Sequence, residues 1–142
     1  MGTINRFRGD YKYLSNFYNC DIKYEGLTFK SVEAAFQAMK VLDKEERKKF
    51  QNISPKEAKR LGRQVKLRPD WEEVKVSIMK DIIYRKFKDS DILRQALLNT
   101  GDLELIEGNT WGDTFWGVSH GEGRNTLGKI LMDTRKQLRE ER

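Results

Sequence analysis

The sequence has a single cysteine, Cys20, a single histidine, His120, and only two prolines. A lone cysteine excludes a disulfide within the chain and suits a reducing compartment. One histidine and one cysteine argue against a zinc site. No apolar run approaches the ~20 residues of a membrane span, and the start, MGTINRFRGD, has no apolar signal segment. We therefore expect a soluble cytoplasmic protein with no metal, no cofactor and no membrane partner.

What the sequence has in excess is positive charge. Its 142 residues carry 28 Lys and Arg against 22 Asp and Glu, a net charge of +6. The length fits one domain, and we assign 1–142 to a single domain. The charge permits nucleic acid or phosphorylated small molecules as partners, but +6 also lies within the ordinary range for a soluble surface, roughly 2–8 in magnitude. Composition leaves both interpretations open.

Apolar spacing predicts an α+β fold that is mostly helical with a small β-sheet or hairpin. Residues 20–29 alternate as a hairpin does, with a turn at Glu25-Gly26. Ser31 is placed to cap the helix that follows. One apolar face of that helix comprises Val32, Ala35, Phe36 and Met39.

Capping patterns predict most of the remaining helices. Ser54-Pro55-Lys56-Glu57 begins a short helix that Gly62 ends. Asp70-Trp71-Glu72-Glu73 begins a long helix to about Phe87, with Trp71, Val74, Ile78 and Ile82 inward. Asp89 or Ser90 begins the next, which carries Ile92, Leu93, Ala96 and Leu97 and stops at 99–101. A short strand follows at 103–107, and a last helix from Asn125 presents Leu127, Ile130, Leu131 and Leu138.

The segment 108–125 concentrates unusual residues. Six of the eleven glycines lie between 108 and 128, and Trp111 and Trp116 flank an acid, Asp113. Rings on such a flexible frame can stack on flat ligands for roughly 1–3 kcal/mol each. Tryptophans can equally plug a core, so each ring alone leaves both interpretations open, whereas the group favours a site.

A second set of candidate residues lies on the helix that Ser31 caps. Glu33, Gln37 and Lys40 share a stripe that flanks the apolar face, neither core nor exposed back. Such a stripe could line a cleft, or it could be an ordinary solvated pair of charges. Farther on, a basic stretch could clamp phosphate beside a cleft or form a solvated helix face. That stretch comprises Lys59, Arg60, Arg63, Lys66 and Arg68.

The sequence contains an incomplete nucleotide-binding motif. The run GRNTLGK at 123–129 has Walker A spacing but is followed by Ile130, which lacks the hydroxyl for Mg²⁺. The remaining chemical groups are carboxylates, lysines and aromatic rings. This inventory suits cleavage of a glycosidic bond, in which a carboxylate stabilises an oxocarbenium-like centre or activates water.

Four motifs in order resemble the YbiA-like, or NADAR, family. They are SNFY, SVEAAFQAMK, SPKEAKRLGR with Trp71 after it, and DTFWGVSHGEGRNTLGKILM, spanning about Phe7 to Leu138. The resemblance implies an α+β domain that handles NAD, ADP-ribose or related ribosylated compounds. YbiA-type members are N-glycosidases of ribosylamino-pyrimidine phosphates in the riboflavin pathway, which we take as the leading function. Removal of ADP-ribose from guanine in nucleic acid, or non-catalytic NAD or ADP-ribose binding, are the alternatives.

Matched position by position, the resemblance implies key positions at Glu33, Lys40, Trp71, Asp113 and Trp116, and the roles that follow are our hypothesis. Glu33 would be the main catalytic carboxylate, and Asp113 would orient the ribose or the water. Lys40 would hold Glu33 ionised or attack the sugar as a Schiff-base nucleophile. Ala34 stands where YbiA-type members often have His, so no imidazole role transfers. The candidate substrate-binding residues are Asn16, Phe17, Gln37, Arg63, Trp71, Trp111, Trp116, Gly117 and Asn125.

Overall fold

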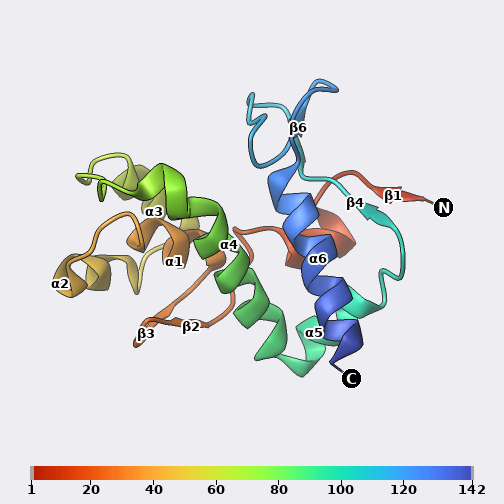
Figure 1. Ribbon diagram of the computed structural model, residues 1–142, viewed down its shortest axis with the longest axis horizontal. Coiled ribbons are helices and arrows are strands. Elements are labelled where there is room, and N and C mark those ends of the chain that lie inside the picture. Colours follow the sequence, from red (N-terminus) through yellow and green to blue (C-terminus); the bar gives the residue numbers. More distant parts are fainter. Residues whose placement is uncertain (1, 142) are drawn as a thin grey trace. The chain divides into compact units, whose positions relative to one another are not determined.

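The computed structural model describes residues 2–141, and it confirms the expected α+β class (Figure 1). Helices dominate, and the strands of the described residues form three two-stranded sheets. Within those residues, no helix has the length and apolarity that a bilayer crossing requires. The elements in chain order are β1 Thr3–Ile4, the 3-10 helix η1 Gly9–Leu14, β2 Ile22–Tyr24, β3 Leu27–Phe29, α1 Val32–Ala38, α2 Lys44–Arg47, the 3-10 helix η2 Lys48–Phe50, α3 Pro55–Gly62, α4 Trp71–Lys88, α5 Asp91–Leu98, β4 Glu104–Leu105, β5 Gly108–Asn109, β6 Val118–Ser119 and α6 Thr126–Glu140.

The chain divides into two compact units. The hairpin unit, Asn16–Lys86, contains β2, β3, α1, α2, η2, α3 and α4 up to Lys86. The α6 unit, Met1–Ser15 with Phe87–Arg142, contains β1, η1, α5, β4, β5, β6 and α6. Each unit holds some of the predicted site residues, and each is described by itself below.

The hairpin unit begins as the sequence predicts. Strands β2 and β3 pair antiparallel, and Tyr24 lies opposite Leu27. The two turn residues, Glu25 and Gly26, both have positive φ, at 50° and 77°. This is what a two-residue hairpin turn matched to the strand twist requires. The Ser31 hydroxyl then accepts a hydrogen bond from the Ala34 amide and caps α1.

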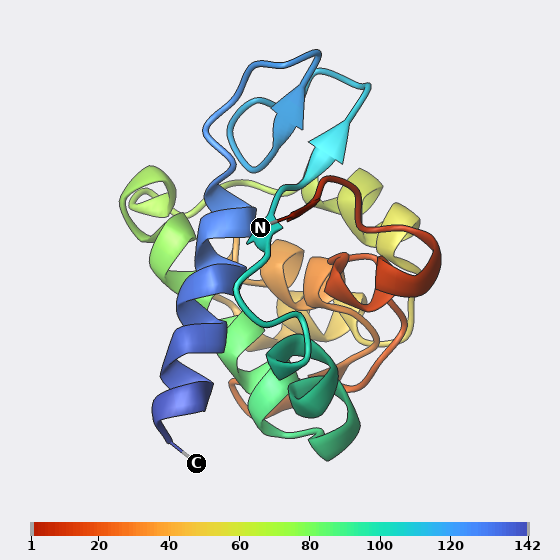
Figure 2. The ribbon, with the colours of Figure 1, turned by 90° about the vertical axis from the view of Figure 1, so that its right-hand side faces the viewer.

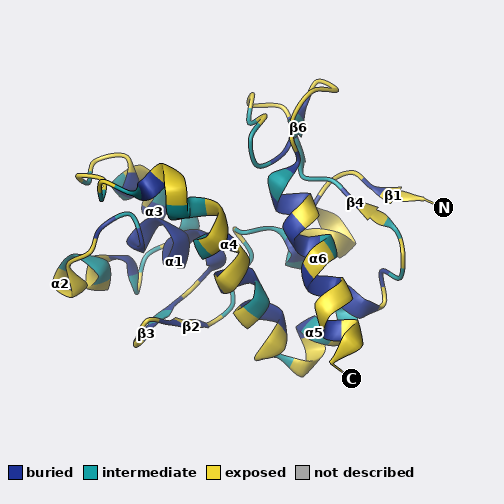
Figure 3. Ribbon diagram, viewed as in Figure 1, coloured by how far each residue is buried: buried dark blue, intermediate teal, exposed yellow. Residues whose placement is uncertain are grey.

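Helix α1 lies at the centre of the hairpin unit. All of its residues are buried, and the helix is dark blue along its length in Figure 3. It packs against α3, which lies beside it (Figure 1). Helix α3 begins as predicted, because the Ser54 hydroxyl accepts a hydrogen bond from the Glu57 amide at 3.1 Å. A seven-residue helix buried on every side leaves its polar residues in contact with neighbouring elements rather than with water.

The long helix α4 is confirmed, but its inward face is turned from the predicted one. The buried residues include Trp71, Met79, Ile82 and Ile83. Val74 and Ile78, predicted inward, are only half-buried. At 100° per residue the buried stripe is centred between Met79 and Ile82–Ile83, and Val74 and Ile78 lie at its border.

In the α6 unit, helix α5 buries only part of its apolar pattern. Ser90 caps it by accepting from the Leu93 amide, and Leu93 and Leu97 are buried as predicted. Ile92, however, is 83% exposed. The sequence places apolar residues at two adjacent positions 100° apart, and only one of them faces the core. The helix ends at 99–101 as predicted, where Gly101 has a φ of 62°.

The last helix and the short strands complete the α6 unit. Strand β4 confirms the strand predicted within 103–107 and pairs parallel with β1. Strands β5 and β6 pair parallel near the amino-terminal end of α6 (Figure 2). Helix α6 follows Asn125, and all four residues predicted inward are buried: Leu127, Ile130, Leu131 and Leu138.

Candidate functional site

Glu33 lies in the first turn of α1, where its backbone amide and its side-chain carboxylate each form a hydrogen bond. Its backbone amide donates to the Asn16 carbonyl at 3.0 Å. Its Oε2 accepts a hydrogen bond from Gln37 Nε2 at 2.6 Å, one helical turn later. Only 9% of Glu33 and 6% of Gln37 are exposed. The prediction that these two residues sit at the rim of the helix is therefore wrong: they are buried in the unit.

Gln37 is covered in part by the close approach of α3 at Gly62. A Cβ on Gly62 would lie 1.9 Å from Gln37 Oε1, so the Gln37 side chain would have to move to admit it. Gly62 does end α3, as predicted, but the next residue, Arg63, keeps right-handed helical angles of φ −77° and ψ −16°. Gly62 itself is not among the glycines with positive φ, so the helix end makes no use of a left-handed glycine. Gly62 is glycine because α1 and α3 meet there.

Lys40 follows α1 and completes the stripe in a half-buried position. Its Nζ donates to the Gly62 carbonyl at 3.4 Å. Burial lowers the pKa of the Lys40 amine, the positive charges of Arg63, Lys59 and Lys75 lower it further, and the negative charge of Glu33 opposes them. A lowered pKa increases the fraction of neutral amine at a given pH, and the neutral amine is the nucleophilic form.

Trp71 begins α4 and packs inside the hairpin unit. It is 6% exposed, and its ring centroid lies 4.9 Å from that of Phe36 at an interplanar angle of 51°. The segment before Trp71 is bonded to the residue that follows α1, because the Arg68 amide donates to the Lys40 carbonyl at 2.8 Å. Trp71 thus lies against the same helix as Glu33, with its ring in the core.

The predicted basic stretch does not act as one group. Arg68 forms an ion pair with Asp70, with Nε 2.7 Å from Oδ1, and its guanidinium is thereby used within the unit. Arg60, Arg63 and Lys66 are exposed. Exposed arginines retain their capacity to bind phosphate, so the end of α3 is the part of the stretch open to a ligand.

Asn16 and Phe17 open the hairpin unit. The Asn16 carbonyl accepts from the Glu33 amide, and its Nδ2 lies 3.6 Å from Met79 Sδ as a donor. Phe17 is 44% exposed. Asn16 is therefore brought to the first turn of α1 beside Glu33.

In the α6 unit, Asp113 builds the turn that carries Trp116. Its Oδ1 accepts hydrogen bonds from the backbone amides of Phe115 at 3.2 Å and Trp116 at 3.0 Å. Asn109 clamps the same residue, since its Oδ1 accepts from the Asp113 amide and its Nδ2 donates to the Asp113 carbonyl. Side-chain hydrogen bonds to the backbone thus hold the turn around Asp113 in place.

The two tryptophans of this loop differ in exposure. Trp111 is 57% exposed. Trp116 is half-buried and meets Phe115 edge to face, with ring centroids 4.8 Å apart. The Arg124 guanidinium lies 5.5 Å from the Phe115 centroid. Trp111 therefore does not fill the core, whereas one edge or face of the Trp116 ring packs against Phe115.

Gly117 and Asn125 hold the loop on the start of α6. A Cβ on Gly117 would lie 2.2 Å from the Glu107 carbonyl oxygen. Asn125 is buried with a left-handed φ of 54°, its Oδ1 accepts from the Glu107 amide, and its Nδ2 donates to the Leu105 carbonyl, each at 2.9 Å. Both ends of its amide are thus used within the unit.

The predicted residues therefore fall into one set in each unit. Asn16, Phe17, Glu33, Gln37, Lys40, Arg63 and Trp71 belong to the hairpin unit, and Trp111, Asp113, Trp116, Gly117 and Asn125 belong to the α6 unit. Sequence reasoning missed the contact of Gly62 with Gln37 and the clamp of Asn109 on Asp113. The second had a signal, because an asparagine four residues before an aspartate in a glycine-rich segment suits side-chain to backbone turns.

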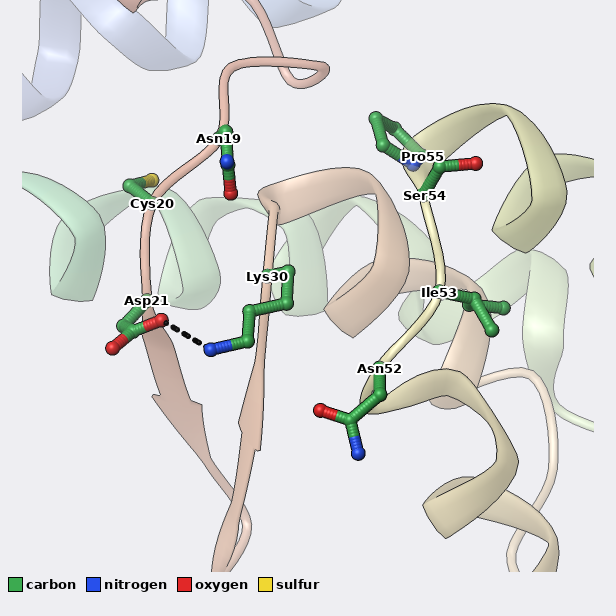
Figure 4. A pocket seen from close by; sticks show the side chains of 8 residues that line it. All are labelled: Asn19, Cys20, Asp21, Lys30, Asn52, Ile53, Ser54 and Pro55. Carbon is green, nitrogen blue, oxygen red and sulfur yellow. Dashed lines mark hydrogen bonds and ion pairs between the residues drawn. The ribbon is translucent and has the colours of Figure 1, made fainter.

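A hollow of about 610 Å³ lies in the hairpin unit away from these residues (Figure 4). Its wall includes Cys20, the Lys30–Asp21 ion pair at 3.2 Å and Ser54 before α3. Burial raises the pKa of the Cys20 thiol, which keeps it in its less reactive form. None of the predicted site residues is among those lining it, and within residues 2–141 no three His, Cys, Asp or Glu side chains gather as a metal site would require.

Comparison with known proteins gives a consistent result. The NADAR domain matches residues 5–139 of this chain. The N-glycosidase YbiA of Escherichia coli is 41% identical over 133 residues, which cover 91% of this chain and 82% of that protein. An N-glycosidase of Nostoc punctiforme is 36% identical, with 91% and 86% covered. A riboflavin biosynthesis protein of Vibrio vulnificus is 39% identical over 90% of this chain and 36% of its own length. The NMR structure of E. coli YbiA superimposes with a TM-score of 0.88 at 38% identity, covering 99% of this chain and 86% of that one.

Proposed function

The chain belongs to the NADAR domain family, and from that premise we propose that it is an N-glycosidase. It hydrolyses the C–N bond between a ribose and a base in a ribosylated, phosphorylated small molecule. Because relatives are named riboflavin biosynthesis proteins, we assign the substrate to the ribosylamino-pyrimidine class. The observation that carries the proposal is the pairing on one stripe of a buried, hydrogen-bonded carboxylate, Glu33, with an amine of lowered pKa, Lys40.

These two groups suit the reaction. Hydrolysis adds one water across the bond, giving the free base amine and the free sugar. The carboxylate can stabilise positive charge at the anomeric carbon or remove a proton from the attacking water. Burial strengthens either effect, because charges interact more strongly away from bulk water.

Lys40 has two possible roles. In the first it stays charged and holds Glu33 ionised. In the second its neutral amine attacks the anomeric carbon, the base leaves, and water releases the sugar from the resulting Schiff base. Borohydride added during turnover distinguishes them: a sugar adduct on Lys40 requires the second, and its absence removes it.

We propose substrate-binding roles for the remaining candidates according to their exposure. Trp111, the exposed ring, stacks on the base for roughly 1–3 kcal/mol. Asp113 orients the ribose or the water, and Arg63 binds the phosphate. The predicted substrate-binding residues also include Asn16, Phe17, Trp71, Trp116, Gly117 and Asn125, whereas Gln37 acts through its hydrogen bond to Glu33. We also keep the prediction that residues 1–142 form a single domain.

The exposed basic side chains at the end of α3 favour a second candidate, ADP-ribose removal from guanine in nucleic acid. Arg60, Arg63 and Lys66 could contact a phosphate backbone. Such contacts release counterions, so binding to a modified strand would weaken steeply with salt. Turnover of a small ribosylated substrate with little salt dependence favours the leading proposal.

One assay tests these functions together. The protein is incubated with ribosylamino-pyrimidine phosphate, NAD, ADP-ribose and DNA carrying ADP-ribosylated guanine, and free base and free sugar are measured. We expect release from the first. Glu33→Gln should abolish release while the fold is retained, whereas Glu57→Gln on the exposed side of α3 should leave it unchanged. Binding without release from any substrate would indicate a sensing module and contradict the enzyme assignment.

A further inference from the structure

We propose that Gln37 is the positioning residue of the Glu33 carboxylate, and that Gly62 is glycine to leave room for the Gln37 amide. This inference rests on the proposed function, because it presupposes that Glu33 acts on the substrate. Gln37 itself contacts no substrate in this proposal. It fixes the rotamer of Glu33 and keeps the carboxylate in the acceptor form.

The orientation of the Gln37 amide carries the first step. Its Nε2 donates to Glu33 Oε2 at 2.6 Å, while its Oε1 is buried and has no hydrogen-bond partner among residues 2–141. Turning the amide over would place two oxygens 2.6 Å apart, which is tolerable only if Glu33 carries a proton. The observed arrangement therefore suits an ionised Glu33.

The charges around the stripe point the same way. Lys40, at the end of the same stripe, interacts electrostatically with Glu33. The charges that act on Lys40 in turn are Lys59 and Arg63 from α3 and its end, and Lys75 from α4. A protonated Lys40 favours the ionised form of Glu33, because nearby positive charge stabilises a carboxylate.

The unpartnered Oε1 supplies the second step. A buried polar atom without a partner costs free energy, and methionine would fill the same space without that cost. Glutamine at this position is therefore not explained by packing alone. Its other end, the hydrogen bond to Glu33, is what methionine would lose.

Gly62 supplies the third step and makes the inference testable. The three atoms nearest to a Cβ at Gly62 all belong to Gln37: Oε1 at 1.9 Å, Cδ at 2.7 Å and Cβ at 3.3 Å. Gly62 lies in a helix, where alanine is otherwise preferred to glycine. Adding one methyl group at Gly62 thus pushes on Gln37 above all, from a residue that makes no contact with the substrate in this proposal.

The experiment measures kcat, KM and the pH profile of kcat for hydrolysis of the ribosylamino-pyrimidine phosphate, with thermal unfolding as the fold control. Gln37→Met should lower kcat about 10–100-fold with KM within about twofold, as expected for a misplaced catalytic group. The acid limb of the pH profile of kcat should move to higher pH in this variant, because the Glu33 carboxylate loses a hydrogen-bond donor that favours its ionised form. Gln64→Met, on an exposed glutamine of the same unit, should change neither.

A double-mutant cycle then tests the route through Gly62. Gly62→Ala alone should reduce kcat and shift the acid limb in the same direction as Gln37→Met. In a Gln37→Ala background, which removes Oε1 and Cδ, Gly62→Ala should change kcat less than twofold.

Three outcomes would overturn the inference: a wild-type pH profile in Gln37→Met, a silent Gly62→Ala, or an undiminished Gly62→Ala effect in the Gln37→Ala background. Should Gln37→Met fail to fold, the Gly62→Ala variant still provides the kcat and pH readouts. Full turnover by Glu33→Gln would instead refute the proposed function. If Glu33→Gln has no turnover while Gln37→Met has the kcat and pH profile of the wild type, only the positioning role of Gln37 is refuted.

Discussion

Trp71 offers the sharpest test of whether an aromatic residue at this site supports the fold or the ligand. The ring is buried and lies 4.9 Å from Phe36. Replacing a buried tryptophan with alanine costs about 3–5 kcal/mol, of which the ring pair contributes about 0.5–1.5 kcal/mol beyond its buried area. Since domains of this size are stable by about 5–15 kcal/mol, Trp71→Ala should remove a large share of the free energy of unfolding.

Urea unfolding followed by circular dichroism measures this loss. Trp71→Phe keeps a ring against Phe36 and should lose only about 1–2 kcal/mol. Trp111→Ala is the matched control: the side chain is mostly exposed, so its loss should stay within about 0.5 kcal/mol while substrate KM rises. A Trp71→Ala variant within about 1 kcal/mol of the wild type would refute the core role and favour a ring that contacts the ligand.

Three further predictions follow from the site and the core. If Lys40 is a nucleophile, kcat/KM should rise with pH along a limb centred below the ordinary lysine pKa of about 10.4, and Lys40→Arg should abolish turnover; a falling limb there would favour the charged role. Asp113→Asn keeps an oxygen that can accept from both amides and should unfold like the wild type, whereas Asp113→Ala should lose about 1–3 kcal/mol; equal stabilities in urea would contradict the turn-building role. Burial lowers the pKa of Lys86 to about 8, so the unfolded chain binds more protons between about pH 8 and 10.4. The unfolding free energy of the wild type relative to Lys86→Met should therefore rise by about 3 kcal/mol across that range, and a flat difference would contradict the neutral buried amine.

Local signals predicted most of the elements because each depends on a few adjacent residues. Ser31, Ser54 and Ser90 cap the helices they were expected to cap, since a hydroxyl before an apolar period satisfies amides that the helix leaves unpaired. The turn at Glu25-Gly26 follows from glycine in the same way. Burial was harder to predict: Ile92 continues the apolar pattern of α5 but faces solvent, because the pattern does not show which side a neighbour covers.

The chemistry of the site was predictable in kind, but its environment was not. The sequence places Asp113 between two tryptophans, but it does not show that one of its carboxylate oxygens accepts from two backbone amides. Asn109 fixes the same residue from four positions earlier. The same residues could form several alternative turns, each with its own side-chain to backbone hydrogen bonds. Residue types alone therefore do not show which turn forms.

Gly62 shows why a sufficient local explanation can conceal a tertiary one. A glycine at the end of a short helix needs no further reason, because it is the usual residue for a left-handed cap. Gly62 does not have a positive φ, which leaves steric room as the reason for the glycine. That room is filled by Gln37, which lies far from Gly62 in the sequence and donates to Glu33. The close packing around Gln37 thus depends on the missing side chain of a residue on another helix, which the periodicity of α1 alone does not show.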